Sequence, residues 1–113
     1  MGGGTGTGRM GRTALVVEDN ASVLKAIARN LGIRGYDVTQ VNYLESKDVP
    51  QGDFDLAIVD GLDGVGINVL RCVHAERKFL YTGSLAMETV AKHSGIEVHL
   101  KEVPLDEILG DEQ

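Results

Sequence analysis

Apolar residues along the chain gather in short segments. TALVV (13–17) is a continuous apolar run, and FDLAIV (54–59), KFLY (78–81) and IEVHL (96–100) are also rich in apolar residues, whereas YDVTQV (36–41) is more polar and alternates polar with apolar residues. Continuous apolar runs of this length are typical of strands buried on both faces, whereas alternation is typical of a half-exposed strand. We therefore expect five strands, with the alternating one at an edge of the sheet.

Helical spacing occupies the segments between the runs. In NASVLKAIARNLGIRG (20–35), the apolar residues Val23, Leu24, Ile27 and Leu31 share one helical face, and glycines end the segment. We expect shorter helices over 66–77, 84–94 and 104–109, while 43–53, broken by Pro50 and Gly52, is a weak helix or a loop. Strands that alternate with helices predict an α/β fold: a doubly wound, five-stranded parallel sheet in the order 2-1-3-4-5.

The 113 residues suit one domain, residues 13–113, after a glycine-rich leader or cloning remnant over 1–12. The single cysteine, Cys72, cannot form an internal disulfide, and we expect it to be a buried apolar residue in a reducing compartment. No apolar run approaches the roughly 20 residues of a membrane span, so we expect a cytoplasmic protein without membrane insertion. The net charge of −6 argues against general nucleic-acid binding.

Reactive side chains stand where four of the five strands end. They are Glu18 and Asp19 after the first strand, Asp60 after the third, Thr82 after the fourth and Lys101 after the fifth. In open parallel sheets, ligands bind at the carboxyl ends of the strands, so these residues should meet there. The second strand ends without a reactive group, and it is also the strand expected farthest from the site.

Each residue also has a plain structural explanation, since Asp19 or Asn20 could simply cap the next helix. The combination is harder to explain that way. Two carboxylates about 4 Å apart repel by roughly 4 kcal/mol at an effective dielectric near 20. Lys101 offsets one charge, and the rest predicts an oxygen-ligated divalent cation, most simply Mg²⁺. Such a pocket suits a phosphoryl group, with Asp60 as the nucleophile.

These motifs, VVEDN, LAIVDG, LYTGS and HLKEVP, give residues 13 to about 109 a resemblance to the receiver domains of bacterial two-component response regulators. The resemblance implies a flavodoxin-like (βα)5 fold. It also implies these roles: Asp60 as phosphoacceptor, Glu18 and Asp19 as the acidic pair for Mg²⁺, the Leu62 carbonyl as a backbone metal ligand, Thr82 as the switch hydroxyl, Gly83 as the small residue that admits the phosphoryl group, and Lys101 as the phosphate-binding lysine.

The same resemblance implies a place in phosphorelay signalling. The expected donor is a histidine kinase or histidine phosphotransfer protein, and the expected output is contact with a downstream protein by a monomer or weak homodimer that is not a turnover enzyme. One alternative is a pseudo-receiver that binds partners without phosphorylation, which Val98, Glu102 and the short helices favour. A second alternative, a flavodoxin-like domain for a small phosphorylated ligand, is opposed by the clustered acids.

Overall fold

The computed structural model describes residues 12–110, and within them five parallel strands form one sheet. The strands are β2 (Arg12–Glu18), β3 (Tyr36–Asn42), β4 (Asp53–Val59), β5 (His74–Thr82) and β6 (Val98–Leu100). Their spatial order is β3-β2-β4-β5-β6, which is the predicted 2-1-3-4-5 order, with the alternating strand β3 at one edge. Residues 1–11 of the expected leader lie outside the described part, and Arg12 is the first residue of β2.

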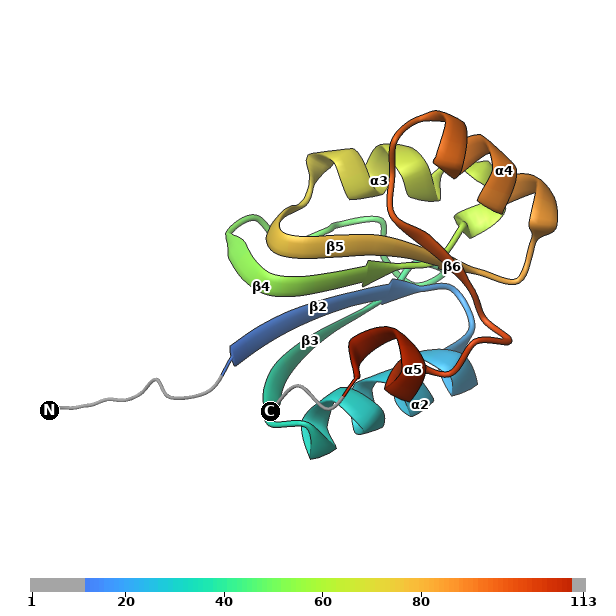
Figure 1. Cartoon of the computed structure of the whole chain (residues 1–113). Helices are drawn as coiled ribbons and strands as arrows, with labels where there is room; N and C mark the ends of the chain where they lie inside the picture. Colours follow the sequence, from blue (N-terminus) through green and yellow to red (C-terminus); the bar gives the residue numbers. More distant parts are fainter. Residues whose placement is uncertain (1–11, 111–113) are drawn as a thin grey trace, which may run out of the picture.

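Helices cover both faces of this sheet (Figure 1). They are α2 (Ala21–Ile33), the 3₁₀ turn η1 (Leu62–Gly64), α3 (Gly66–Cys72), α4 (Leu85–His93) and α5 (Leu105–Leu109). The helices α2 and α5 lie on one face, and α3 and α4 lie on the other. None of the helices in the described range is long and apolar enough to cross a membrane.

The central strands divide the core into two layers. In β2 the four residues 14–17 have no exposed surface, and successive side chains alternate between the faces. Ala14 and Val16 pack with the apolar residues of α2 and α5, whereas Leu15 and Val17 pack with those of α3 and α4. Burial on both faces explains why these strands are continuous apolar runs, and it fixes where their carboxyl ends lie.

The expected helix over 66–77 is wrong in its second half. Helix α3 ends at Cys72, Val73 takes an extended conformation, and β5 begins at His74. The segment His74–Arg77 continues the ladder with β4, where its backbone gains sheet pairing. Lys78 Nζ donates to the carbonyls of Leu70 and Val73, at 2.8 and 2.9 Å, and so gives hydrogen-bond partners to carbonyl groups at the end of the helix.

Cys72 is exposed at this helix end, so the expectation that it is a buried apolar residue is also wrong. The inward residues of α3 are Ile67 and Leu70, and Cys72 lies about 200° round the helix from Leu70, so its side chain faces outward. Residues 43–53 form no helix, which leaves the loop alternative, and the last strand begins at Val98 rather than at residue 96. Strand β6 therefore pairs with only the last three residues of β5, Leu80–Thr82.

Candidate functional site

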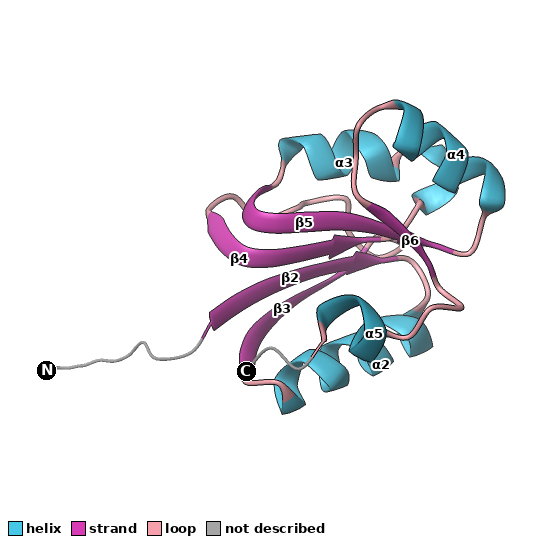
Figure 2. Ribbon diagram, viewed as in Figure 1, coloured by secondary structure: helices cyan, strands magenta, loops and turns pink. Residues whose placement is uncertain are grey.

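The carboxyl ends of the strands lie together at one end of the sheet, where the loops into α2, η1, α4 and α5 begin (Figure 2). Neighbouring strands deliver Glu18 from β2, Asp60 from just after β4, Thr82 from β5 and Lys101 from just after β6. The parallel order brings together residues as far apart in sequence as Glu18 and Lys101. The structure thus gathers the predicted side chains into one site.

Lys101 joins two of the carboxylates. Its Nζ lies 2.8 Å from Glu18 Oε1 and 2.5 Å from Asp60 Oδ1. Glu18 is 1% exposed, which is exceptional for a glutamate, and its second oxygen accepts the backbone N–H of Asn20 at 3.1 Å. A buried carboxylate needs such partners, because an unpaired one would shift to its neutral form. The lysine therefore fixes the spacing of the two acids.

The ionisation of the pair reflects this arrangement. Burial raises the pKa of Glu18, and the charge of Asp60 raises it further, against the hydrogen bond from Lys101 that lowers it. Burial alone would lower the pKa of Lys101, but hydrogen bonds to Asp60 and Glu18 outweigh burial and raise it. Lys101 is thus held in its cationic form between the carboxylates.

Three carboxylates converge beside this lysine. One oxygen from each of Glu18, Asp19 and Asp60 lies within 4.8 Å of the others. The cap of α2 is Asn20, whose Oδ1 accepts the N–H groups of Ser22 and Val23 at 3.0 and 3.1 Å, so Asp19 is not used as the cap. An all-oxygen donor set with excess negative charge fits a hard divalent cation such as Mg²⁺ or Ca²⁺.

The loop after Asp60 is tightly folded. The Leu62 N–H donates to Asp60 Oδ2 at 2.8 Å, and Leu62 and Asp63 take left-handed backbone angles with φ of 50° and 54°. Such angles are uncommon for residues other than glycine. The Leu62 carbonyl, the expected backbone metal ligand, accepts the Val65 N–H at 3.2 Å and retains a second lone pair. The carboxylate of Asp60 is thereby tied at one oxygen by backbone and at the other by Lys101.

A cavity of about 390 Å³ lies beside Asp60. Asp60 and Thr82 line it together with Gly83, Ser84 and Met87. A Cβ placed on Gly61 would lie 3.0 Å from Thr82 Oγ1, so the hydroxyl approaches the chain directly after Asp60. Nothing lies within 4 Å of a Cβ placed on Gly83, so the space next to this residue is open.

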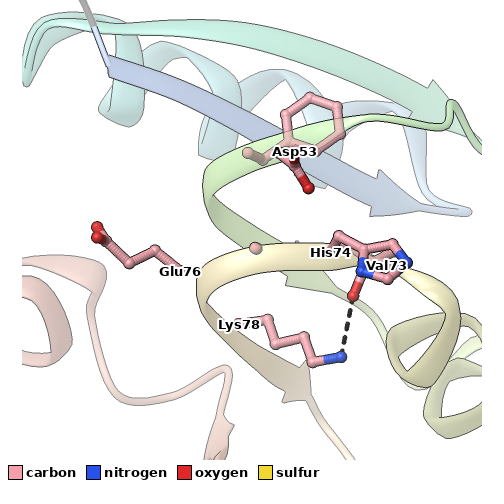
Figure 3. A pocket seen from close by; sticks show the side chains of 7 residues that line it. Asp53, Val73, His74, Glu76 and Lys78 are labelled. Atoms are coloured by element: carbon pink, nitrogen blue, oxygen red, sulfur yellow. Dashed lines mark hydrogen bonds between the residues drawn. The ribbon is translucent and has the colours of Figure 1, made fainter.

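A second cavity, of about 420 Å³, lies at the opposite end of the sheet, at the amino ends of β4 and β5 (Figure 3). Asp53, His74 and Glu76 line it but do not converge on one point, and Lys78 turns away to the Val73 carbonyl. This cavity brings together no set of groups with a common chemistry, so the strand carboxyl ends remain the candidate site.

Two residues of the site were missed from the sequence. Gly66 packs its backbone against the loop, since a Cβ there would lie only 2.1 Å from the Asp60 carbonyl oxygen. The Tyr81 hydroxyl donates a hydrogen bond to the Val103 carbonyl at 2.6 Å, two residues after Lys101. The signal for Tyr81 was present, because a tyrosine in a buried strand needs a partner for its hydroxyl. The sequence does not say which partner it has.

Comparisons with known proteins agree with this geometry. No protein-family model matches the sequence, and no curated protein is significantly similar to it. Among solved structures, it is similar to a response regulator from Burkholderia pseudomallei, with 27% identity, a TM-score of 0.64, and coverage of 90% of this chain and 66% of that one. That protein contains a phosphorylated aspartic acid, a calcium ion and citrate.

Two further matches cover the chain to a similar extent. The bacteriophytochrome response regulator AtBRR has 20% identity and a TM-score of 0.64, and 89% of each chain is covered. A response regulator from Thermotoga maritima has 17% identity and a TM-score of 0.61, with 88% of this chain and 92% of that one covered. The chain has the receiver-domain fold. In this receiver fold the acidic cluster of Glu18, Asp19 and Asp60 occupies the carboxyl ends of the strands, as the resemblance implied.

Proposed function

We propose that this receiver domain accepts a phosphoryl group on Asp60, from a histidine kinase or histidine phosphotransfer protein in the cytoplasm, and signals through contact with a downstream protein. The observation that carries the proposal is the contact of Lys101 with both Asp60 and Glu18, beside a cavity that Thr82 also lines. Three acids, a lysine and a hydroxyl around an open cavity suit a phosphoryl group.

The reaction is a displacement at phosphorus. A carboxylate oxygen of Asp60 forms the new O–P bond, and the P–N bond of the donor phosphohistidine breaks, leaving the electron pair on the imidazole nitrogen, which takes a proton from solvent. Lys101 neutralises negative charge on the phosphoryl oxygens, and the Thr82 hydroxyl donates to one of them. The domain assists its own modification and keeps the phosphoryl group covalently bound, so in this proposal it is a substrate of the transfer rather than a turnover enzyme.

A divalent cation fits the remaining charge. Glu18, Asp19, Asp60 and the Leu62 carbonyl would hold Mg²⁺, with Glu18 and Asp19 as the acidic pair. When bound, the cation neutralises charge on the acids and on the phosphoryl group. The calcium ion in the Burkholderia protein supports a hard cation in this fold, since both ions take oxygen ligands.

The test is intact mass after incubation with acetyl phosphate and Mg²⁺, with Asp60→Asn in parallel. We expect the wild-type chain to gain one phosphoryl mass (about 80 Da, as for any carboxylate nucleophile) and Asp60→Asn to gain none. Removal of Mg²⁺ with a chelator should also abolish the gain.

A wild-type chain that binds Mg²⁺ but never gains mass from acetyl phosphate or from any phosphohistidine donor would contradict the proposal. It would favour the pseudo-receiver alternative, in which the domain binds partners without modification. A mass gain that persists in Asp60→Asn would place the phosphoryl group elsewhere and would contradict the role of Asp60.

A further inference from the structure

Lys101 is half-buried, and it follows the edge strand β6 although it is central to the site. It follows β6, which has three residues and pairs only with β5 among the described strands. Its own N–H donates to the Thr82 carbonyl at 2.8 Å, and then the chain turns, with Val103 N–H on the Leu100 carbonyl at 2.9 Å. A lysine at the end of a three-residue edge strand needs another anchor to hold its side chain between two acids.

Tyr81 supplies a contact to this turn from the neighbouring strand. Its hydroxyl donates to the Val103 carbonyl at 2.6 Å and lies 3.4 Å from the carbonyl oxygen of Lys101 itself. Tyr81 immediately precedes Thr82, so two successive residues of β5 hold the chain on both sides of Lys101. Thr82 holds it through backbone, and Tyr81 holds it through its side chain.

We propose that Tyr81 is a positioning residue that holds Lys101 between Glu18 and Asp60 by anchoring the turn after β6. The consequence for phosphoryl transfer rests on the proposed function, but the placement of Lys101 does not. Tyr81 touches neither the acids nor the cavity beside Asp60 in the contacts described above, and it acts through the backbone of residues 101–103.

The surroundings of Tyr81 favour a fixed hydroxyl. The side chain is 7% exposed and packs in the core layer of α2 and α5, with its ring 6.2 Å from that of Phe79 in an edge-to-face arrangement. Burial raises the pKa of Tyr81, although the charge of Lys101 opposes this, so the hydroxyl keeps its proton and remains a donor. A rigid ring with a single donor suits an anchor.

The turn that Tyr81 holds continues directly into α5. Pro104 precedes the first residue of that helix, and α5 is bound to α2 by Arg34, whose guanidinium contacts Asp106 Oδ1 at 2.6 Å and the Gly110 carbonyl at 2.8 Å. The turn is therefore fixed at its far end by α5 and at its near end by β5. Loss of the Tyr81 hydroxyl would free only the stretch that carries Lys101.

The test compares Tyr81→Phe with Tyr43→Phe, which removes the same hydroxyl from a half-buried tyrosine after β3. The first readout is the rate at which an amine-acylating reagent modifies Lys101, followed by peptide mass spectrometry. Lys92, which is largely exposed, and Lys78, which is bonded to the end of α3, are internal references in the same digest. The second readout is the rate of phosphorylation by acetyl phosphate with Mg²⁺.

In Tyr81→Phe we expect modification of Lys101 to rise several-fold, with Lys78 and Lys92 unchanged. Phosphorylation should slow by about 10- to 100-fold, because displacement of a catalytic group by about 1 Å costs that much. Tyr43→Phe should match the wild type in both readouts. Unchanged modification of Lys101 in Tyr81→Phe, or a rise shared equally with Lys78, would overturn the proposal.

The two readouts separate this inference from the proposed function. A wild-type chain that is never phosphorylated would contradict the function, while the modification of Lys101 would still decide the role of Tyr81. If Tyr81→Phe fails to fold, 3,5-difluorotyrosine at position 81 replaces it, since fluorination makes the phenol acidic enough to lose its proton under mild conditions. The ratio of Lys101 modification to Lys92 modification is then measured against pH in two proteins, one with 3,5-difluorotyrosine at position 81 and one with it at position 43. This ratio should rise more steeply with pH in the first protein. Equal slopes in the two proteins would overturn the proposal.

Discussion

Gly66 shows how much the position of Asp60 depends on a residue with no side chain. Gly66 begins α3, directly against the loop after β4, and the Gly66 N–H donates to the Gly61 carbonyl at 2.9 Å. A Cβ on Gly66 would meet the carbonyl oxygens of both Asp60 and Gly61, at 2.1 and 2.8 Å. These atoms belong to backbone, so they cannot move aside as the end of a flexible side chain would.

Gly66→Ala should therefore lower the free energy of unfolding by about 1–3 kcal/mol, the usual range for overpacking. It should also slow phosphorylation of Asp60, because the loop would have to shift. Gly83→Ala is the matched control for stability alone, since its Cβ would meet no heavy atom within 4 Å, and its free energy of unfolding should stay within about 0.5 kcal/mol of the wild type. Urea unfolding of both variants checks this, and equal stabilities would contradict the steric argument.

At the same scale, the sequence predicted the reactive residues better than their supports. Glu18, Asp60 and Lys101 could be found because strand ends are recognisable and their chemistry is distinctive. Gly66 could not be found, because the need for a glycine there arises from a close approach between two backbones that no local pattern records. The contact that Tyr81 makes with Val103 joins a strand to a loop 22 residues later, which is equally invisible in a local pattern.

At the start of α2, one residue caps the helix and its neighbour belongs to the acidic site. Two neighbouring polar residues precede it, and Asn20 alone accepts the free N–H groups of the first turn. Asp19 is left to the acidic cluster. The sequence left this choice open, because aspartate and asparagine are equally good caps.

This division predicts opposite effects for two adjacent substitutions. Asn20→Ala should lower the free energy of unfolding by about 1 kcal/mol through loss of the cap. Asp19→Asn should leave stability without divalent cations unchanged or slightly higher, since it removes one of three converging charges. It should weaken Mg²⁺ binding by about tenfold or more.

Urea unfolding of each variant with and without Mg²⁺ measures both effects, because a ligand that binds the folded state raises the unfolding midpoint. The Mg²⁺-dependent rise should persist in Asn20→Ala and shrink in Asp19→Asn. Destabilisation by Asp19→Asn in the absence of Mg²⁺ would show that its carboxylate supports the helix after all.

The boundary between α3 and β5 is where element prediction failed. The segment 66–77 carries helical spacing up to Val73, and its charged residues Glu76 and Arg77 are ordinary on a helix surface. The segment forms a strand because it pairs with β4, a partner 21 residues earlier that local spacing does not reveal. Tertiary pairing of this kind commonly overrides intrinsic preference.

For the whole molecule, strand order was the most predictable property. Right-handed crossovers and burial on both faces leave few arrangements for five alternating strands and helices. Because the strands are parallel, Glu18 and Lys101 lie at the same end of the sheet, although they are 83 residues apart in sequence. The lengths of the outer elements were less predictable, because an edge strand such as β6 has fewer neighbours to fix where it begins.

The shortness of β6 has a consequence for how copies of this protein meet. Residues 74–79 of β5 have β4 as their only strand neighbour within the described chain, so one side of their backbone lies at the sheet edge. Such an edge can add a strand from another molecule and start aggregation, and charged side chains on it oppose this. His74 and Glu76 are exposed there.

Replacing both residues with valine should leave the fold intact but promote concentration-dependent self-association, visible by sedimentation velocity as the loss of the slowest species. Glu45→Val, which removes a similar charge from an exposed turn after β3, should have little effect. If the double variant stays as dispersed as the wild type, the edge is protected by shape rather than by charge. The polar residues that obscured the start of β5 in the sequence would thus help to keep the protein in solution.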